Sequence, residues 1–319
     1  MAHQTGSCTS TEDAINKLID FVNNYTNWTA STSGISPSGY DHDWTFTKGT
    51  RKVYLAYDTA GNGTIRGMCS PTTQASWPTY DYNSASNTTG LYGSEVNSCK
   101  GATTYHFFES RGEEIYVALK IGSRWTHFCF GNMLKRGSWT GGLYFAPVYS
   151  DPDYATSAAD INNNFLFGPA KNLNDSGMNN RCMPHYDIEQ DTRIIAIGKA
   201  GAYTTVNQGK YSAVRPMYGM SFDMINNADG ALLRTGNAYN KRTIGLPLDF
   251  FILDESDSKW RHIGSITGIR FVNVEYLDAG ETINTDWMVF PLTSKSAGDG
   301  TFCTSDNFGV AYRIGNLST

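Results

Sequence analysis

Charged residues are scarce in this sequence of 319 residues, and none of them form a basic run. Asp, Glu, Lys and Arg together make up 17% of the chain, and the formal net charge is −5. Nucleic-acid-binding proteins obtain much of their affinity from basic patches that neutralise phosphates. The sequence therefore predicts a protein without a nucleic-acid partner.

Long apolar runs are also missing. The longest candidates, 194–198 and 246–253, have the length of a strand, well below the roughly 18 residues that a membrane-spanning helix needs. The opening stretch MAHQTGSCTSTED lacks the basic start and the apolar centre of a secretory signal. We therefore expect no membrane insertion and no export by that route.

Common catalytic and cofactor motifs are absent as well. The chain contains no G-x-S-x-G, no P-loop and no H-E-x-x-H, which are typical of serine hydrolases, nucleotide-binding enzymes and zinc proteases. Its six histidines are scattered, and only His42 has an acidic residue on each side. We predict no catalytic residues, no cofactor and no metal site.

The six cysteines lie far apart, form no C-x-x-C pair, and occupy Cys8, Cys69, Cys99, Cys129, Cys182 and Cys303. Structural zinc sites take their thiolates from closely spaced pairs. We expect reduced thiols that are mostly buried and pack as small apolar side chains.

The abundant residues favour a β protein. Gly (32), Tyr (19) and Phe (16) are frequent, which suits short strands and tight turns. Strand-like runs separated by turn residues recur at 52–57, 64–68, 104–109, 113–121, 124–130, 143–149, 192–198, 269–276, 286–290 and 308–314. Asn62 and Gly63 form a typical hairpin turn pair. The predicted fold class is mainly β, with an antiparallel β-sandwich-like core.

One amphipathic helix is predicted near the N-terminus. Thr9 and Glu12 have the spacing of a capping box at its start. The apolar stripe that follows has i, i+3, i+4 and i+7 spacing and consists of Ile15, Leu18, Ile19 and Val22. Such a stripe must be buried, either on the β sheet of its own chain or, as a candidate assembly face, against a neighbouring subunit.

The chain divides into an N-terminal helical element, 1–30, and a β-rich body, 31–319. Asn, Asp, Gly and Pro become frequent again after residue 150, which suggests a lobe boundary near 150–180.

Segment 70–103 carries few aliphatic side chains and is punctuated by proline, asparagine and glycine, which predicts a long surface excursion. Its aromatic residues form a candidate binding surface: Trp77, Tyr80, Tyr82 and Tyr92. Such side chains stack on sugars or anchor protein interfaces. A second aromatic group within 125–149 is assigned mostly to the core, because strand alternation sends half of the side chains inward.

Two clusters of acidic residues are predicted to be exposed to solvent and to have no catalytic or metal-binding role. Asp187, Glu189 and Asp191 alternate as on a strand edge, where calcium binding is the less favoured alternative. The acidic residues of 254–257 precede a basic stretch and are typical of a charged hairpin tip, although a glycosidase acid and base pair is the other reading.

Three parts of the chain resemble virion structural proteins of tailed bacteriophages that have a similar length. The first is the helical segment 11–21 leading to Trp28, and the second is the strand block 114–119, 125–135 and 137–142. The third is the ending, 301–314. Long stretches between them are unmatched.

The resemblance implies a tail, neck or baseplate protein of the virion, assembled in the host bacterial cytoplasm with other virion structural proteins, and no catalytic residues to carry over. A subunit of this kind is expected to form a homo-oligomer. Two alternatives stay open: a module that binds a host surface glycan or receptor, and a glycan-cleaving enzyme.

Overall fold

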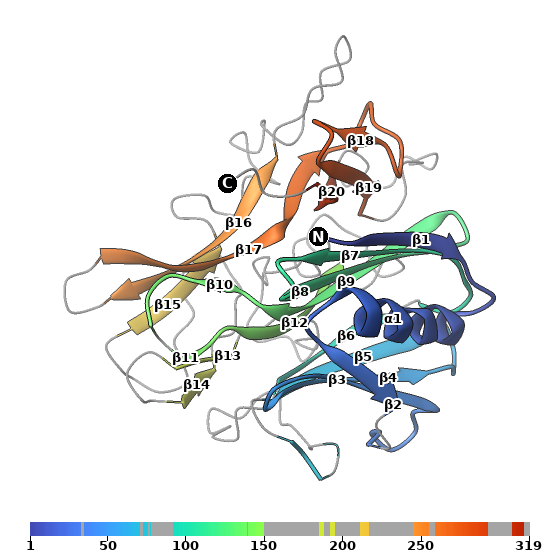
Figure 1. The fold of residues 1–319 in the computed structure, drawn as a ribbon, viewed down its shortest axis with the longest axis horizontal. Coiled ribbons are helices and arrows are strands. Elements are labelled where there is room, and N and C mark those ends of the chain that lie inside the picture. Colours follow the sequence, from blue (N-terminus) through green and yellow to red (C-terminus); the bar gives the residue numbers. More distant parts are fainter. Residues whose placement is uncertain are drawn as a thin grey trace.

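The computed structural model describes residues 1–32, 35–70, 73–75, 77, 92–97, 99–138, 140–149, 185–187, 192–194, 211–216, 245–254, 259–292 and 308–315. Strands β1 to β20 and the helix α1 make up their regular structure. Every pairing between these strands is antiparallel. The predicted fold class, mainly β with a sandwich-like core and an N-terminal amphipathic helix, is confirmed (Figure 1).

The described strands form four sheets. The central sheet has the order β1 (His3–Ser7), β7 (Ala102–Ser110), β8 (Glu114–Ile121), β9 (Arg124–Asn132) and β12 (Leu143–Tyr149). The lower sheet consists of β2 (Thr29–Thr32), β3 (His42–Lys48), β4 (Arg51–Asp58), β5 (Thr64–Ser70) and β6 (Tyr92–Asn97). The consecutive antiparallel strands predicted for 104–149 are thus observed in the central sheet.

The other two sheets come from the second half of the chain. The upper sheet has the order β15 (Tyr211–Pro216), β16 (Leu246–Asp254), β17 (Lys259–Asn273), β20 (Phe308–Arg313), β19 (Trp287–Pro291) and β18 (Thr282–Ile283), and β10 (Leu134–Lys135) also pairs with β17. A small sheet joins β11 (Thr140–Gly141), β13 (His185–Asp187) and β14 (Thr192–Ile194).

Helix α1 (Thr11–Tyr25) begins one residue later than its sequence suggested. Ser10 is the N-cap: its backbone is extended and its hydroxyl accepts a hydrogen bond from the Asp13 amide at 3.0 Å. The Asp13 carboxylate in turn accepts from the Thr9 amide at 2.8 Å. The predicted pair of Thr9 and Glu12 is therefore wrong by one position, because the Ser10 hydroxyl is equally able to cap the helix. Asp13, three residues after the cap, accepts from the amide of Thr9 just before it.

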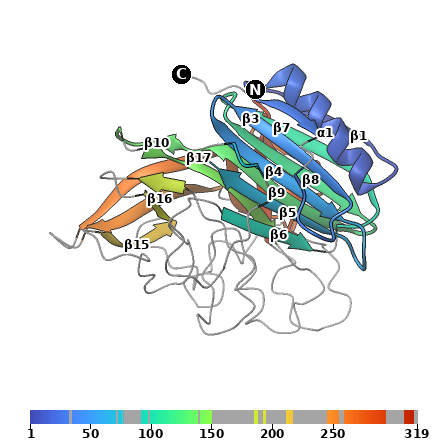
Figure 2. The ribbon, with the colours of Figure 1, turned by 90° about the horizontal axis from the view of Figure 1, so that it is seen from below.

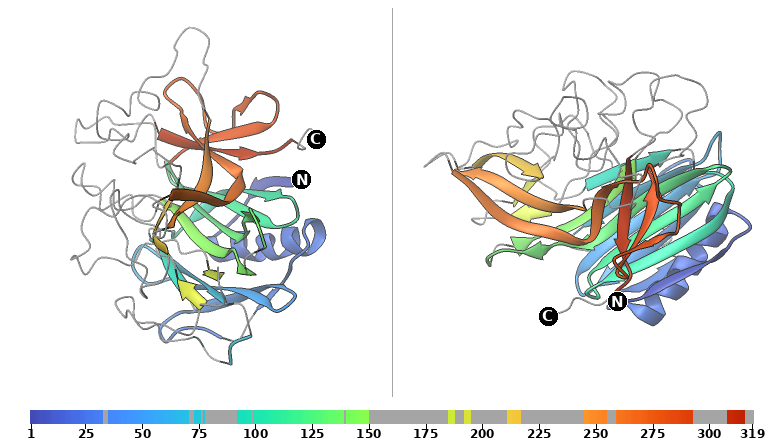
Figure 3. Two further views of the ribbon diagram at one scale, coloured as in Figure 1. Left: turned by 90° about the vertical axis from the view of Figure 1, so that its left-hand side faces the viewer. Right: turned by 90° about the horizontal axis from the view of Figure 1, so that it is seen from above.

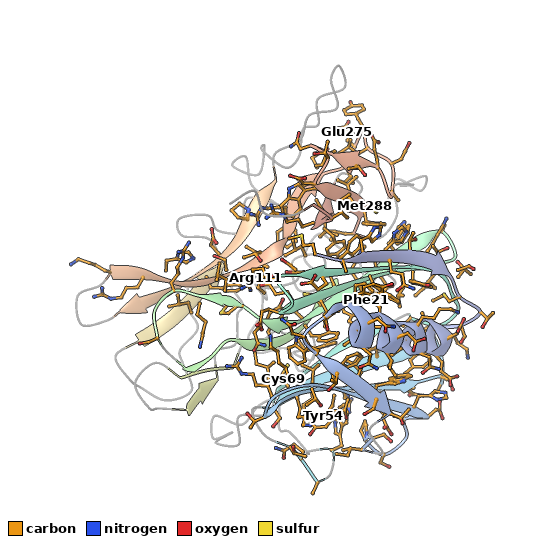
Figure 4. The ribbon with its side chains drawn as sticks, in the orientation of Figure 1. Phe21, Tyr54, Cys69, Arg111, Glu275 and Met288 are labelled. Carbon is orange, nitrogen blue, oxygen red and sulfur yellow. The ribbon has the colours of Figure 1, made fainter. Side chains whose placement is uncertain are left out.

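The apolar stripe of α1 lies in the main core, which the helix shares with the central and lower sheets. The helix packs on β7 and β2, and in Figure 2 it runs along one side of the stacked strands. Phe21, on the same buried side of the helix, is fully buried, with its ring centroid 5.7 Å from that of Phe107 on β7 (Figure 4). Full burial of such a side chain stabilises the fold by roughly 1.5–3 kcal/mol.

The central sheet is buried on both faces. One face of β7 to β9 carries Phe107, Val117 and Phe130 into the main core. The opposite face meets the upper sheet, where the rings of Phe108 and Tyr312 stack with centroids 4.9 Å apart. In the left view of Figure 3, the upper, central and lower sheets follow one another as three layers. This explains why β8 and β9 are almost continuously buried instead of alternating with solvent.

The β4–β5 hairpin turn has positive φ angles at Gly61 and Gly63 instead of at Asn62 and Gly63. Gly63 also approaches another part of the backbone, since a Cβ there would lie 2.8 Å from the amide nitrogen of Lys100. Glycine is needed at this position for both reasons.

Four of the cysteines, Cys8, Cys69, Cys99 and Cys129, are free and buried, as predicted, and the other two lie outside the described residues. The lobe boundary predicted near 150–180 lies outside them too. Within the described part of the chain, no helix combines the length and apolar character that a membrane span requires.

Candidate functional site

The upper sheet contains a β-bulge that gathers three reactive side chains. Phe250 pairs with Gly264 and Phe251 pairs with His262, so Ile263 of β17 has no residue opposite it on β16. Residues three apart in a regular strand point to opposite faces, but one inserted residue turns them to the same face. His262 and Ser265 thereby meet beside Asp249, the residue that pairs with Ser265. We call Asp249, His262 and Ser265 the bulge cluster.

The polar atoms of the bulge cluster are in close contact. The Ser265 hydroxyl donates to Asp249 Oδ1 at 2.5 Å. His262 Nε2 lies 3.3 Å from Ser265 Oγ, 3.6 Å from Asp249 Oδ1 and 3.0 Å from the Gly264 carbonyl oxygen. The His262 and Asp249 side chains are 29% and 31% exposed, so solvent reaches the cluster.

These residue types are those of a serine hydrolase, but their connections differ. In a catalytic triad, the histidine lies between the serine and the carboxylate, using one ring nitrogen for each. Here Ser265 bonds directly to Asp249, and Nε2 of His262 faces both of them and a carbonyl oxygen. The cluster does not have the proton path of a triad, and its geometry favours cation or hydrogen-bond chemistry.

A second irregularity of β17 joins the upper sheet to the central sheet. Leu248 pairs with Ile266 and Pro247 pairs with Arg270, so 267–269 leave the pairing with β16. Their backbone amides need other acceptors. The Thr267 amide donates to the Glu114 carboxylate at 3.1 Å, and the Gly268 amide donates to the Tyr116 hydroxyl at 2.9 Å. A Cβ at Gly268 would overlap the Tyr116 ring, so this approach requires glycine.

We call Arg111, Glu114, Tyr116 and Thr267 the intersheet cluster. Glu114 is fully buried and accepts further hydrogen bonds from the Thr267 hydroxyl at 2.7 Å and the Tyr116 hydroxyl at 3.0 Å. Burial raises the pKa of Glu114, and the Arg111 guanidinium, 3.1 Å from its carboxylate, acts in the opposite direction. Arg111 has a φ of 61° in the β7–β8 turn, at the junction of the two sheets (Figure 4). A buried carboxylate of this kind depends on its partners.

Three histidines share the aromatic layer between the central and upper sheets. His127 is fully buried, with Nε2 2.9 Å from the Pro291 carbonyl oxygen and Nδ1 3.0 Å from the Tyr312 hydroxyl oxygen. Burial lowers its pKa to about 4. Burial also lowers the pKa of His106 to about 4 and that of His3, whose rings stack with centroids 5.7 Å apart. The layer therefore favours neutral imidazoles.

The candidate assembly face on the helix must be corrected. Ile15, Leu18 and Val22 are fully buried in the main core, and Ile19 is partly buried against it. Of the two alternatives for this stripe, packing on the protein's own sheets is the one observed. These side chains are unavailable to a neighbouring subunit because the central and lower sheets already cover them.

The candidate aromatic surface is only partly described. Trp77 is half-buried and packs on Tyr54, with ring centroids 6.4 Å apart, instead of standing free as a stacking platform. Tyr92 lies in β6, where its backbone pairs with Cys69. Tyr80 and Tyr82 lie outside the described residues.

The other predictions have mixed outcomes. The aromatic residues assigned to the core are buried wherever they are described, and they are Trp125, Phe128, Phe130, Tyr144 and Phe145. His42 stacks on Trp44 and lies 3.3 Å from the Glu12 carboxylate. Asp254 pairs with Lys259 at the end of the β16–β17 hairpin, while 188–191 and 255–258 lie outside the described residues.

Sequence reasoning missed both polar clusters. One local signal for the bulge was present: apolar residues on β17 recur at Ile263, Ile266 and Ile269, a spacing of three that breaks the alternation of a strand, and Gly264 interrupts the run. Comparison with protein-family models and with curated proteins found no match.

Proposed function

We propose that this chain is a structural subunit of a tailed bacteriophage particle, which assembles in the virion with other tail, neck or baseplate proteins. The observation that carries this proposal is the use of the buried polar groups. Glu114 and His127, which are fully buried, and Arg111, which is partly buried, all bind groups of another sheet of the same chain. Groups used in this way serve to hold layers together, which is the requirement of a rigid building block.

The three-layer arrangement supports the same proposal. Because the central sheet is covered on both faces, neither outer sheet can separate without exposing aromatic side chains. Loss of the upper sheet would expose Phe108 and Phe290, and loss of the lower sheet would expose Phe46 and Phe130. A subunit that bears load between neighbours benefits from such a body, since its layers unfold together. The resemblance of the sequence to virion proteins of tailed bacteriophages is the reason for proposing the phage particle as the assembly.

The test is the absolute mass of the full chain in solution, measured by size-exclusion chromatography with light scattering in buffer containing EDTA, followed by negative-stain electron microscopy. We expect a discrete homo-oligomer or ring, or a stable complex with a purified virion protein. A chain that stays monomeric over the whole accessible concentration range and binds no virion protein would contradict the proposal. If that monomer binds host cells, the glycan- or receptor-binding alternative takes its place.

A further inference from the structure

Three side-chain donor atoms of the bulge cluster surround one point. His262 Nε2, Ser265 Oγ and Asp249 Oδ1 form a triangle with sides of 3.3, 2.5 and 3.6 Å. All three corners of such a triangle can lie about 2.1 Å from a common centre just outside its plane, which is the usual length of Zn–N and Zn–O bonds.

We propose that the bulge cluster binds a divalent first-row transition metal ion, with Zn²⁺ as the reference ion. The described residues contain no group of three His, Cys, Asp or Glu side chains placed to hold a metal, and here the third donor is the hydroxyl of Ser265. The Gly264 carbonyl oxygen, 3.0 Å from His262 Nε2, is near enough to serve as a further ligand. Partial exposure of His262 and Asp249 leaves room for water to complete the coordination.

The donor types decide the class of ion. An imidazole nitrogen suits zinc, nickel and copper, whereas calcium and magnesium require six or more oxygens from carboxylates, carbonyls and water. One nitrogen with one carboxylate and neutral oxygens therefore favours the transition metals. The single negative charge and the weak hydroxyl donor predict a modest affinity for the ion.

Metal binding moves a proton within the neutral His262 ring, and the ring keeps the same number of protons. In the metal-free cluster, Nε2–H of His262 donates to the Gly264 carbonyl and the Ser265 hydroxyl donates to Asp249. A metal takes the Nε2 lone pair, so the ring proton moves through solvent to Nδ1. The Ser265 hydroxyl stays protonated and turns its hydrogen toward water, which frees Asp249 Oδ1 to bind the ion.

The bulge is the feature that makes the site. A regular β17 would carry His262 on the face opposite to Ser265, and the triangle would not form. Bulges re-aim side chains in this way beside functional sites. The metal site goes beyond the proposed virion role and does not depend on it.

The experiment is a calorimetric titration of the tag-free, chelator-treated full chain with zinc chloride. We expect one zinc ion per chain, and at least about tenfold weaker binding for His262→Gln and for Asp249→Asn. His42→Gln is the matched control, because His42 also lies near a carboxylate, Glu12 Oε1 at 3.3 Å, with side chains that are 31% and 43% exposed. This control should keep the wild-type affinity.

A second measurement separates loss of the site from loss of the fold. Zinc should raise the thermal unfolding midpoint of the wild type and of His42→Gln, but not of His262→Gln, whose circular dichroism spectrum should match the wild type. No saturable binding by the wild type, or unchanged binding by folded His262→Gln, overturns the proposal. Equal affinity for calcium overturns the assignment to transition metals. None of these results bears on the assembly test, which is done in EDTA.

Discussion

Protonation of His127 should make the stability of the protein fall between pH 7 and pH 5. A carbonyl oxygen can only accept, so the contact with Pro291 places a proton on Nε2, and Nδ1 must then accept from the Tyr312 hydroxyl. The neutral ring is thus fully satisfied. A second proton would disrupt the bond from Tyr312 and leave a charge among the rings of Trp125 and Phe290.

The direction and size of the effect follow from linkage. The pKa of His127 is lowered to about 4 by burial, against an ordinary value of 6.5. Between these two values, the unfolded chain binds a proton that the folded chain does not. The stabilisation is therefore fully present above pH 6.5 and is lost as the pH falls, by about 2 kcal/mol between pH 7 and pH 5. His106, whose pKa is also lowered, contributes in the same direction.

The assay is urea unfolding at pH 7 and pH 5, for the wild type and for His127→Gln, which retains an amide donor and an acceptor but cannot be protonated. The variant should lose about 2 kcal/mol less than the wild type over this pH interval. An equal pH dependence of the wild type and His127→Gln would refute the reasoning.

Three further predictions concern stability at neutral pH, each measured by urea unfolding. Arg111→Met leaves the buried Glu114 carboxylate without its cation and should lower the free energy of unfolding by about 3–5 kcal/mol, and adding Glu114→Gln should restore part of it. Leu18→Ala empties a fully buried position and should lower it by about 2–5 kcal/mol, whereas Ile19→Ala, at a partly buried position, should have a smaller effect. Ser10→Ala removes the helix cap and should lower it by about 1 kcal/mol, with Thr9→Ala as the milder control, since the amide of Thr9 still bonds to Asp13. Equal effects within either matched pair would contradict the assigned roles.

Short-range patterns were enough to predict the helix and most strands of the first half. The apolar stripe from Ile15 to Val22 has the helical period, and this period predicts the position of α1 without any knowledge of what the stripe packs against. The turn at Arg111 and Gly112 was also predictable, because Gly112 lies between two strand-like runs and glycine accepts the positive φ that a tight turn needs. The cap was wrong by one residue because Thr9 and Ser10 carry the same kind of hydroxyl.

What covers a surface is set by partners that are distant in the sequence. His106, Glu114 and His127 lie on one face of the central sheet, and polar residues on a strand face usually mean solvent. That face is instead buried, because Thr267, Pro291 and Tyr312 supply the matching groups from more than 150 residues further along the chain. No local sequence pattern indicates such a pairing, so the intersheet cluster could not be predicted from a single sequence.

Both polar clusters depend on the register of one strand segment. Ser265 contacts Asp249 on β16, and two residues later Thr267 contacts Glu114 on β8. Shifting β17 by one residue would exchange its faces and remove both contacts at once, leaving Glu114 buried without Thr267. The intersheet cluster therefore fixes the register that the bulge cluster needs, even though the two use different side chains. The buried Glu114 carboxylate therefore has a structural role, which is to fix the register of β17. Apolar packing alone would fix it less well, because apolar side chains tolerate a shift in register far better than a charge that has only one matching set of donors.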